Sequence, residues 1–130
     1  MNINYIKALN KLKFTMIDME KIINNGNAKS FEDKQICLLF ENLLEDVRLL
    51  THKIEYYSKT PISGVIHELP NGHFEIRGHE LTCGSPLEIF SKRYDEWFPG
   101  RVEYDDKYYF YCGDLGNPAL YVGMEARIRI

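Results

Sequence analysis

The sequence EWFPGRVEYDDKYYFYC, residues 96–112, predicts a β-hairpin. Two runs rich in aromatic and β-branched residues, which are favoured in strands, stand on either side of Asp105 and Asp106. Asp is common in tight turns because its side chain bonds to the nearby backbone and because it tolerates left-handed conformations. We therefore interpret the acidic pair as the turn of the hairpin, and not as two catalytic carboxylates that flank a cleft.

The second run of this hairpin carries aromatic side chains on both of its faces. Successive side chains of a strand point to opposite faces, so Tyr109 and Tyr111 share one face while Tyr108 and Phe110 share the other. One face of a small sheet cannot bury both sets. We expect one set in the core and the other exposed or covered by helices, which makes the second set a candidate for binding.

Short strand-like runs continue on both sides of the hairpin and are separated by turn residues. No segment long enough for a helix interrupts them, so residues 64–130 are predicted to form a small, all-β, SH3-like barrel. The further runs cover residues 64–69, 73–78, 79–82, 87–90, 119–123 and 125–130.

The first 58 residues show a helical period instead. Apolar side chains at steps of three and four predict helices over residues 3–24 and 31–57, joined by a short polar link into an antiparallel hairpin. Ser30 begins a capping pattern, and Gly26 is expected to take the left-handed conformation that ends the first helix. A linker over residues 59–63 leads to the barrel, which makes the chain α+β.

Each helix is expected to bury one apolar stripe. The stripe of the second helix is long and wide, so it needs cover from the C-terminal half or from a second copy of the chain. We favour the second copy, as a homodimer through the helices, because the C-terminal half is expected to form a barrel without help from the helices. The stripes comprise Ile3, Ile6, Leu9, Leu12, Met16, Met19 and Ile22 or Ile23 in the first helix, and Ile36, Leu39 or Phe40, Leu43, Val47, Leu50, Ile54 and Tyr57 in the second, widened by Leu38, Leu44 and Leu49.

The net charge of −3 gives the chain no overall basic field that would attract nucleic acid. Residues 61–130 are more acidic, with seven Lys and Arg against eleven Asp and Glu, a net of −4. No apolar run reaches the roughly 18 residues of a membrane span, and the N-terminus lacks a signal-peptide pattern. Three cysteines without a CxxC pair fit reduced thiols, so we expect a cytoplasmic protein that does not bind membranes.

Several spaced motifs of the C-terminal half resemble a known family. They are GVI at 64–66, NGHFEI at 71–76, LTCGSPLEIF at 81–90, WFPGRVEYDDKYYFY at 97–111 and GMEARIRI at 123–130. In this order they resemble DUF5348, a family of small bacterial proteins, over residues 63–130. The resemblance implies a firmicute-type protein of mobile-element context without an assigned activity, and it carries over no catalytic residues. The helical half lies outside it.

No group of residues indicates catalysis or a metal site. His67, His73, His79 and Cys83 are spaced widely, across a turn, and do not form the close ligand pairs of structural zinc sites. Cys83 has no helix N-terminus behind it that would favour a reactive thiolate, so we interpret it as a turn residue. A phosphate-binding GK[ST] loop is absent. We therefore expect no cofactor, no metal and no enzymatic activity.

The aromatic and arginine residues of the C-terminal half are candidates for binding a protein partner. Protein interfaces favour Tyr, Trp and Arg and disfavour Lys, and this half has five Arg against two Lys. We predict a non-enzymatic protein-interaction module. The alternative is a protein that binds nucleic acid by stacking, which the acidic charge disfavours, or a nucleic-acid mimic that inhibits a defence nuclease. The candidate residues are Tyr94, Trp97, Arg101, Glu103, Tyr104, Tyr109, Tyr111, Arg127 and Arg129.

Overall fold

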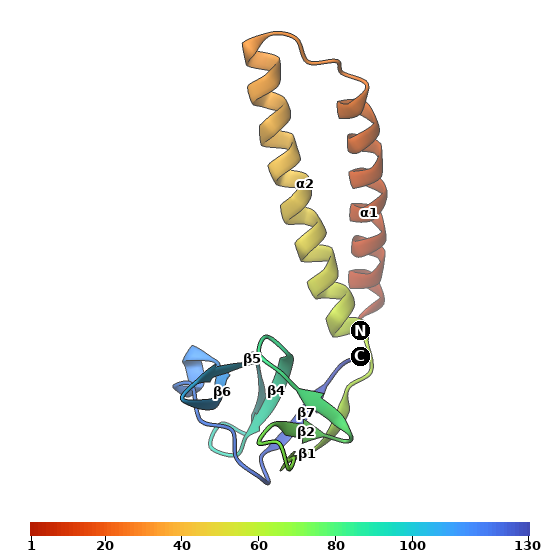
Figure 1. The fold of residues 1–130 in the computed structure, drawn as a ribbon. Coiled ribbons are helices and arrows are strands. Elements are labelled where there is room, and N and C mark those ends of the chain that lie inside the picture. Colours follow the sequence, from red (N-terminus) through yellow and green to blue (C-terminus); the bar gives the residue numbers. More distant parts are fainter. The chain divides into compact units, whose positions relative to one another are not determined.

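The computed structural model describes all 130 residues and divides them into two compact units, Met1–Lys59 and Thr60–Ile130 (Figure 1). The first unit consists of two helices, and the second is built on an antiparallel sheet. The chain is therefore α+β, and each unit has buried apolar side chains of its own.

Two long helices form the first unit: α1 spans Ile3–Asn24 and α2 spans Phe31–Ser58. The Ser30 side chain accepts a hydrogen bond from the backbone N–H of Asp33 at 3.0 Å. This bond satisfies one of the amide groups that the first turn of a helix leaves without a partner. The start of α2 therefore lies where the capping pattern predicts it.

The connection between the helices turns at Asn27, whose φ is 50°, so the prediction of Gly26 for the left-handed position is wrong. The Gly26 amide instead donates to the Ile23 carbonyl at 3.0 Å and prolongs the last turn of α1. Asn visits the left-handed region at modest cost because its short polar side chain can bond locally. The chain reverses one residue later than expected.

The two helices meet along a line that includes Leu9 of α1 and Leu44 and Thr51 of α2, all of which are buried. The Thr51 hydroxyl donates to the Arg48 carbonyl at 2.8 Å, so its burial leaves no hydroxyl without a partner. Positions 44 and 51 are seven residues apart, which is about two helical turns and keeps one side of α2 against α1.

The predicted buried stripe of α2 is only partly buried. Val47 and Ile54 are half-buried, but five other members are exposed, because α1 covers one side of a stripe that is wider than a single neighbouring helix. On α1, the predicted Ile3, Ile6 and Ile22 are exposed as well. The exposed fractions on α2 are 51% for Ile36, 69% for Leu39, 49% for Leu43, 50% for Leu50 and 47% for Tyr57.

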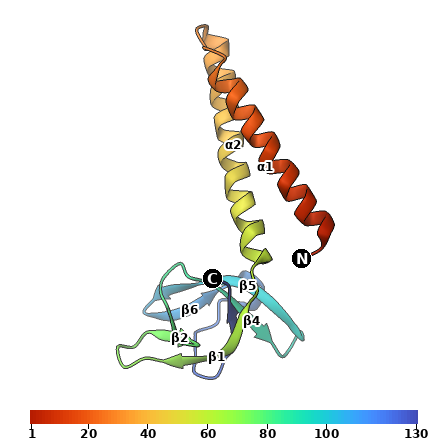
Figure 2. The same cartoon turned by 90° about the vertical axis from the view of Figure 1, so that its right-hand side faces the viewer.

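Seven antiparallel strands form the sheet of the second unit, in the order β3-β2-β1-β7-β4-β5-β6. The sheet curls into a half-barrel with one face turned inward (Figure 2). The strands are β1 (Ile62–Glu68), β2 (Phe74–Ile76), β3 (His79–Leu81), β4 (Pro86–Ser91), β5 (Glu96–Asp105), β6 (Lys107–Tyr111) and β7 (Glu125–Ile128), and a short 3-10 helix, Gly113–Leu115, follows β6.

Strand β1 joins the two parts of the curled sheet. Residues 62–65 pair with β7, whereas residues 66–68 pair with β2. The strand therefore begins inside the linker expected over residues 59–63. The linker is shorter than predicted because Ile62 and Ser63 already have partners in β7.

Residues 119–123 do not form the predicted strand, and Ala119 makes only an isolated bridge to Tyr109. The segment instead bonds along the free edge of β6. The Phe110 amide donates to the Pro118 carbonyl at 2.8 Å, and the Leu120 amide donates to the Tyr108 carbonyl at 3.0 Å. Pro118 has no N–H to donate, which limits this segment to a partial ladder.

The hairpin of β5 and β6 has the turn and the alternation that the sequence predicts. Asp105 pairs with Lys107 around Asp106, whose φ is 62°. Val102 and Phe110 are direct cross-strand partners, and both are fully buried. The inner face of the hairpin therefore belongs to the core.

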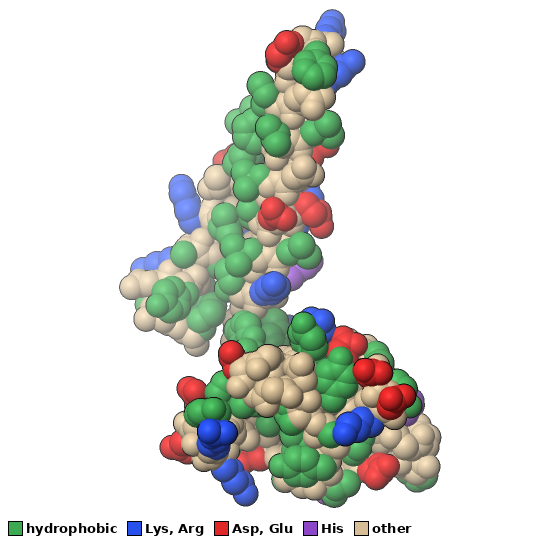
Figure 3. Space-filling view, turned by 90° about the vertical axis from the view of Figure 1, so that its left-hand side faces the viewer, with side chains coloured by type: hydrophobic (Ala, Val, Ile, Leu, Met, Phe, Trp, Pro, Cys, Tyr) green, Lys and Arg blue, Asp and Glu red, His purple; other side chains and the backbone are tan.

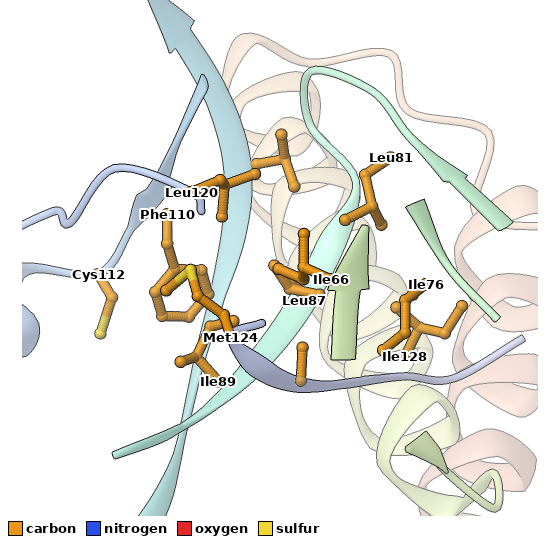
Figure 4. Close-up of a cluster of buried hydrophobic side chains, with 12 residues drawn as sticks. Ile66, Ile76, Leu81, Leu87, Ile89, Phe110, Cys112, Leu120, Met124 and Ile128 are labelled. Carbon is orange, nitrogen blue, oxygen red and sulfur yellow. The ribbon is translucent and has the colours of Figure 1, made fainter. Parts of the chain in front are cut away.

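The core lies on the inner side of the curled sheet, and Figure 4 shows its side chains coming from β1, β2, β4, β6 and β7. Full burial of a large apolar side chain stabilises a fold by about 1.5–3 kcal/mol. The largest fully buried residues are Phe110, Ile66, Ile76, Leu87 and Val102.

Close packing at Gly100 of β5 requires a residue without a side chain. A Cβ atom at this position would lie 2.7 Å from the ring of Phe110 and 2.5 Å from the backbone oxygen of Tyr111. Such distances are far inside van der Waals contact, and the fully buried Phe110 ring has no space into which to move.

We expect Gly100→Ala to lower the free energy of unfolding of the sheet unit by about 1–3 kcal/mol, because the added methyl overpacks the core. Trp97, the single tryptophan, reports on this unit in urea unfolding followed by fluorescence. Gly113→Ala is the matched control, because a Cβ there meets no atom within 4 Å. Equal stability of Gly100→Ala and wild type would contradict the packing described here.

Candidate interaction surfaces

The side of the sheet that faces away from the core gathers aromatic, arginine and glutamate side chains. On β5 the even-numbered Val102 points to the core, so the odd-numbered Trp97 and Arg101 point outward. We call this set the outer face. It comprises Glu88 and Phe90 from β4, Trp97, Arg101 and Glu103 from β5, Tyr109 and Tyr111 from β6, Arg127 from β7 and Arg129 just after it.

Glu88 lies within the outer face, and its side chain is only 5% exposed. Arg127 Nε donates to Glu88 Oε1 at 3.0 Å, and Arg129 Nε donates to Glu88 Oε2 at 2.7 Å. Burial alone would raise the pKa of Glu88, but the hydrogen bonds from Arg129 and Arg127 outweigh it and hold this pKa below its ordinary value. The carboxylate therefore stays ionised at neutral pH and orients both guanidinium groups.

Arg127 also covers Trp97. Its Cζ atom lies 4.2 Å from the centroid of the indole ring, which is within the range of a cation–π interaction. Phe90 is the cross-strand partner of Trp97, and the two ring centroids are 5.4 Å apart at an interplanar angle of 63°. One side of the indole is therefore occupied by a cation of the same chain.

A second arginine–aromatic pair lies at the β6 end of the outer face. Arg101 is the cross-strand partner of Tyr111, and its Cζ atom lies 4.3 Å from the centroid of that ring. Arg101 Nε also donates to Glu103 Oε1 at 2.7 Å. Tyr111 remains 45% exposed, so this end of the outer face is accessible while the Glu88 end is closed.

Two of the predicted binding residues lie elsewhere. Tyr94 is in the turn between β4 and β5, with its ring centroid 5.7 Å from that of Phe98. Tyr104 points to the other side of β5 and packs against Tyr108 at 4.9 Å, and Tyr108 in turn contacts Phe74 of β2 at 6.2 Å. This aromatic group joins the two ends of the curled sheet. The seven other predicted residues lie together on the outer face.

Glu88 and Phe90 belong to the outer face but are not among the predicted residues. The sequence feature that could have identified Glu88 is its position in a strand between Leu87 and Ile89, which are both buried. An acidic side chain in the middle of such a strand requires a basic partner. The sequence contains Arg127 and Arg129, but only the pairing of β4 with β7 brings them to Glu88.

The helical hairpin has two contrasting faces. On one of them, which we call the ion-paired face, Lys13 pairs with Glu55 and Arg48 pairs with Glu20, so that both pairs join α1 to α2. Arg48 also bonds to Glu45 at 3.0 Å. The hydrogen bond from Lys13 lowers the pKa of Glu55, and the bond to Glu20 raises the pKa of Arg48. The charges of this face have partners within the hairpin.

The opposite side is apolar, and we call it the apolar face. With about 100° of rotation per residue, Tyr5, Leu12 and Ile22 of α1 fall on the side of the Leu9 contact line away from the ion pairs. A groove of about 420 Å³ opens there, lined among others by Tyr5, Leu12 and Tyr57. Figure 3 shows hydrophobic side chains along the hairpin. From α2 the apolar face includes Ile36, Leu39, Leu43, Leu50 and Tyr57, all exposed.

The residues considered for chemistry lie apart from one another. No three His, Cys, Asp or Glu side chains are grouped so that they could hold a metal ion. Cys83 is exposed in the turn before β4, whereas Cys112 is buried and Cys37 is half-buried in the hairpin. No helix combines the length and the apolar character that crossing a bilayer requires.

We expect Glu88→Gln to destabilise the sheet unit by about 3 kcal/mol at pH 7, because it leaves two guanidinium groups beside a poorly solvated site without their anion. The pKa of Glu88 is lower in the folded state, so its contribution is complete above the unfolded-state pKa and is lost as the pH falls through the folded-state pKa. The difference in stability between wild type and variant should therefore shrink as the pH is lowered from 7 toward about 2. Urea unfolding at both pH values measures this difference, and a difference that persists in acid would contradict it.

The C-terminal half of the chain matches a known family model. Residues 65–128 match the model described as Domain of unknown function (DUF5348), a range that includes most of β1 and all of β2 to β7. The helical hairpin lies outside the match. No curated protein and no solved structure matches the chain. The resemblance expected from the spaced motifs is confirmed: the C-terminal half of this chain carries the sequence pattern of the DUF5348 family, a domain of unknown function.

Proposed function

We propose that this protein is a non-enzymatic interaction module, in which the hairpin self-associates and the sheet unit presents its outer face to a protein partner. The observation that carries the proposal is the apolar face, where five large side chains of α2 are 47–69% exposed. Burial of apolar surface is favourable by roughly 25 cal/mol per Å². A second neighbour for α2 would bury this surface.

A second copy of the chain suits the hairpin as that neighbour. Each hairpin consists of two antiparallel helices. When the apolar faces of two hairpins meet, they form a four-helix bundle in which each helix has two neighbours. The ion-paired face would remain in water, where Lys13 and Arg48 already lie. Contiguous apolar patches beyond a few hundred Å² are rare on monomeric proteins and mark interaction sites, which also supports self-association.

The outer face supports binding of a protein more than binding of nucleic acid. Trp, Tyr and Arg dominate the energetics of protein interfaces, and Arg101 and Tyr111 are accessible at one end. We propose that the half-barrel is of the SH3-like type and takes an extended peptide across this end, in the cytoplasm, by analogy with small barrels that bind peptides in aromatic grooves.

The alternative function, nucleic-acid binding, is disfavoured because the arginines of the outer face already contact carboxylates. Arg127 and Arg129 are bonded to Glu88, and Arg101 is bonded to Glu103. A phosphate would have to displace these carboxylates. The indole of Trp97 offers at most one side for stacking, because Arg127 occupies the other.

We expect the purified chain to sediment as a dimer whose population falls on dilution. Leu50→Glu should raise the dimer dissociation constant by about 100-fold or more, because it places a charge in an apolar contact. Leu49→Glu is the matched control: Leu49 is 54% exposed against 50% for Leu50, but it points away from α1 and from the apolar face. A chain that is monomeric at every concentration, or an equal effect of both variants, would refute self-association through this face.

We expect no binding of short duplex DNA or single-stranded RNA at low salt, measured by fluorescence anisotropy with labelled oligonucleotides. The arginines of the outer face are neutralised by Glu88 and Glu103, and the half is acidic overall. Tight binding that weakens steeply as salt is raised would favour the nucleic-acid alternative over a protein partner.

A further inference from the structure

Among the charged residues that take no part in the ion pairs of the hairpin, four border the middle of the apolar face: Lys11 and Asp18 on α1, and Asp46 and Lys53 on α2. All four are exposed. Within each pair the residues are seven apart, so they lie on the same side of their helix, about 10 Å from each other along its axis. In its middle part, each edge of the apolar face therefore carries one positive and one negative charge.

The contacts between the helices fix the heights of these charges along the hairpin. The ion pair between Lys13 of α1 and Glu55 of α2 brings Lys11 to within about one helical turn of the height of Lys53. Farther along, the ion pair between Glu20 and Arg48 brings Asp18 to within about one helical turn of the height of Asp46. Both lysines thus lie toward the open end of the hairpin, and both aspartates lie toward its connecting loop.

In a parallel dimer, the two-fold axis runs along the helices, and α1 of one copy lies beside α2 of the other. The heights are then equal in both copies. Lys11 would face Lys53 of the second copy, and Asp18 would face Asp46. Like charges would meet at all four edge contacts of the bundle, which is unfavourable.

In an antiparallel dimer, the two-fold axis is perpendicular to the helices, so α1 meets α1 and α2 meets α2 of the second copy. An axis at the height midway between the charges then places Lys11 beside Asp18 and Lys53 beside Asp46 of the second copy. The midpoints are residue 14.5 on α1 and 49.5 on α2, which lie within about one helical turn of the same height. An axis between the two midpoints therefore brings opposite charges to all four contacts, within reach of the long lysine side chains.

We propose that the second copy docks on the apolar face in this antiparallel orientation, as a four-helix bundle closed by Lys11–Asp18 and Asp46–Lys53 ion pairs between copies. The inference rests on the proposed self-association and specifies its geometry. Leu50 lies next to the two-fold axis and packs on Leu50 of the second copy. The same residues of both copies build the interface, as an isologous contact requires.

Charge reversal distinguishes the two orientations by the sign of its effect. In the antiparallel dimer, Lys53→Glu faces Asp46 of the second copy, and Asp46→Lys faces Lys53. Each variant should raise the dimer dissociation constant by about 3- to 30-fold, because the change occurs at two symmetric exposed contacts. In a parallel dimer, Lys53→Glu would face Lys11 and tighten the dimer. The measurement is sedimentation equilibrium of the full chain at low salt, with the effect shrinking as salt is raised.

The double variant Asp46→Lys with Lys53→Asp is the matched control, because it exchanges the two charges and should restore the dissociation constant to within about threefold of wild type. Lys34→Glu, an exposed change on α2 away from the apolar face, controls for net charge and should have little effect.

Disulfide formation gives a second test of the dimer orientation, which does not depend on charge. In a Cys83→Ser background, which removes the exposed native thiol, Leu50→Cys should cross-link two copies under mild oxidation. Leu43→Cys should not, because the two introduced thiols would lie about 20 Å apart along the bundle. A dimer that tightens with Lys53→Glu, or that fails to cross-link through position 50, overturns the antiparallel geometry while self-association stands. A chain without any dimer overturns both.

Discussion

The apolar stripe of α2 is wider than α1 can cover, and the properties of the hairpin follow from this mismatch. Two packed helices touch along one line with their axes about 8–10 Å apart. That line uses Leu44 and Thr51, which leaves Leu43 and Leu50, each rotated by about 100°, in water. On the other side of the line, salt bridges such as Lys13–Glu55 occupy the surface. The remaining apolar side is where a further helix pair can be added without disturbing charges that already have partners.

The sheet unit, unlike the hairpin, buries its apolar face within its own chain. Its inner face is filled, with Gly100 giving room to Phe110. Its outer face keeps a glutamate and two arginines in fixed contact, and it braces one arginine on Trp97. Side chains held in this manner lose little rotamer freedom when a partner binds, which reduces the entropic cost of association. The outer face is therefore a pre-ordered surface, whereas the hairpin presents exposed apolar area.

Local patterns in the sequence predicted local structure well, and contacts between distant segments account for what they missed. The cap at Ser30 and the turn at Asp105 and Asp106 depend on neighbouring residues, and both are found. The contact line on α2 differs because Thr51 is not apolar, yet a hydroxyl that bonds to its own helix can be buried. Glu88 meets Arg127 from 39 residues away, a contact that no periodicity encodes. Tyr104 is a candidate because of its aromatic side chain, although strand alternation alone already places it opposite Arg101 and Glu103, and its contact with Tyr108 agrees with that placement.

The segment after the 3-10 helix, residues 118–120, protects one edge of the sheet from pairing with other chains at high concentration. An uncovered strand edge offers a template on which other chains can add strands, the route by which many β proteins form fibres. Here the carbonyl of Pro118 and the amide of Leu120 occupy the edge of β6. The opposite edge, β3, is only three residues long. Both edges of the sheet are therefore poor templates for cross-β growth, even where many sheet units are crowded together.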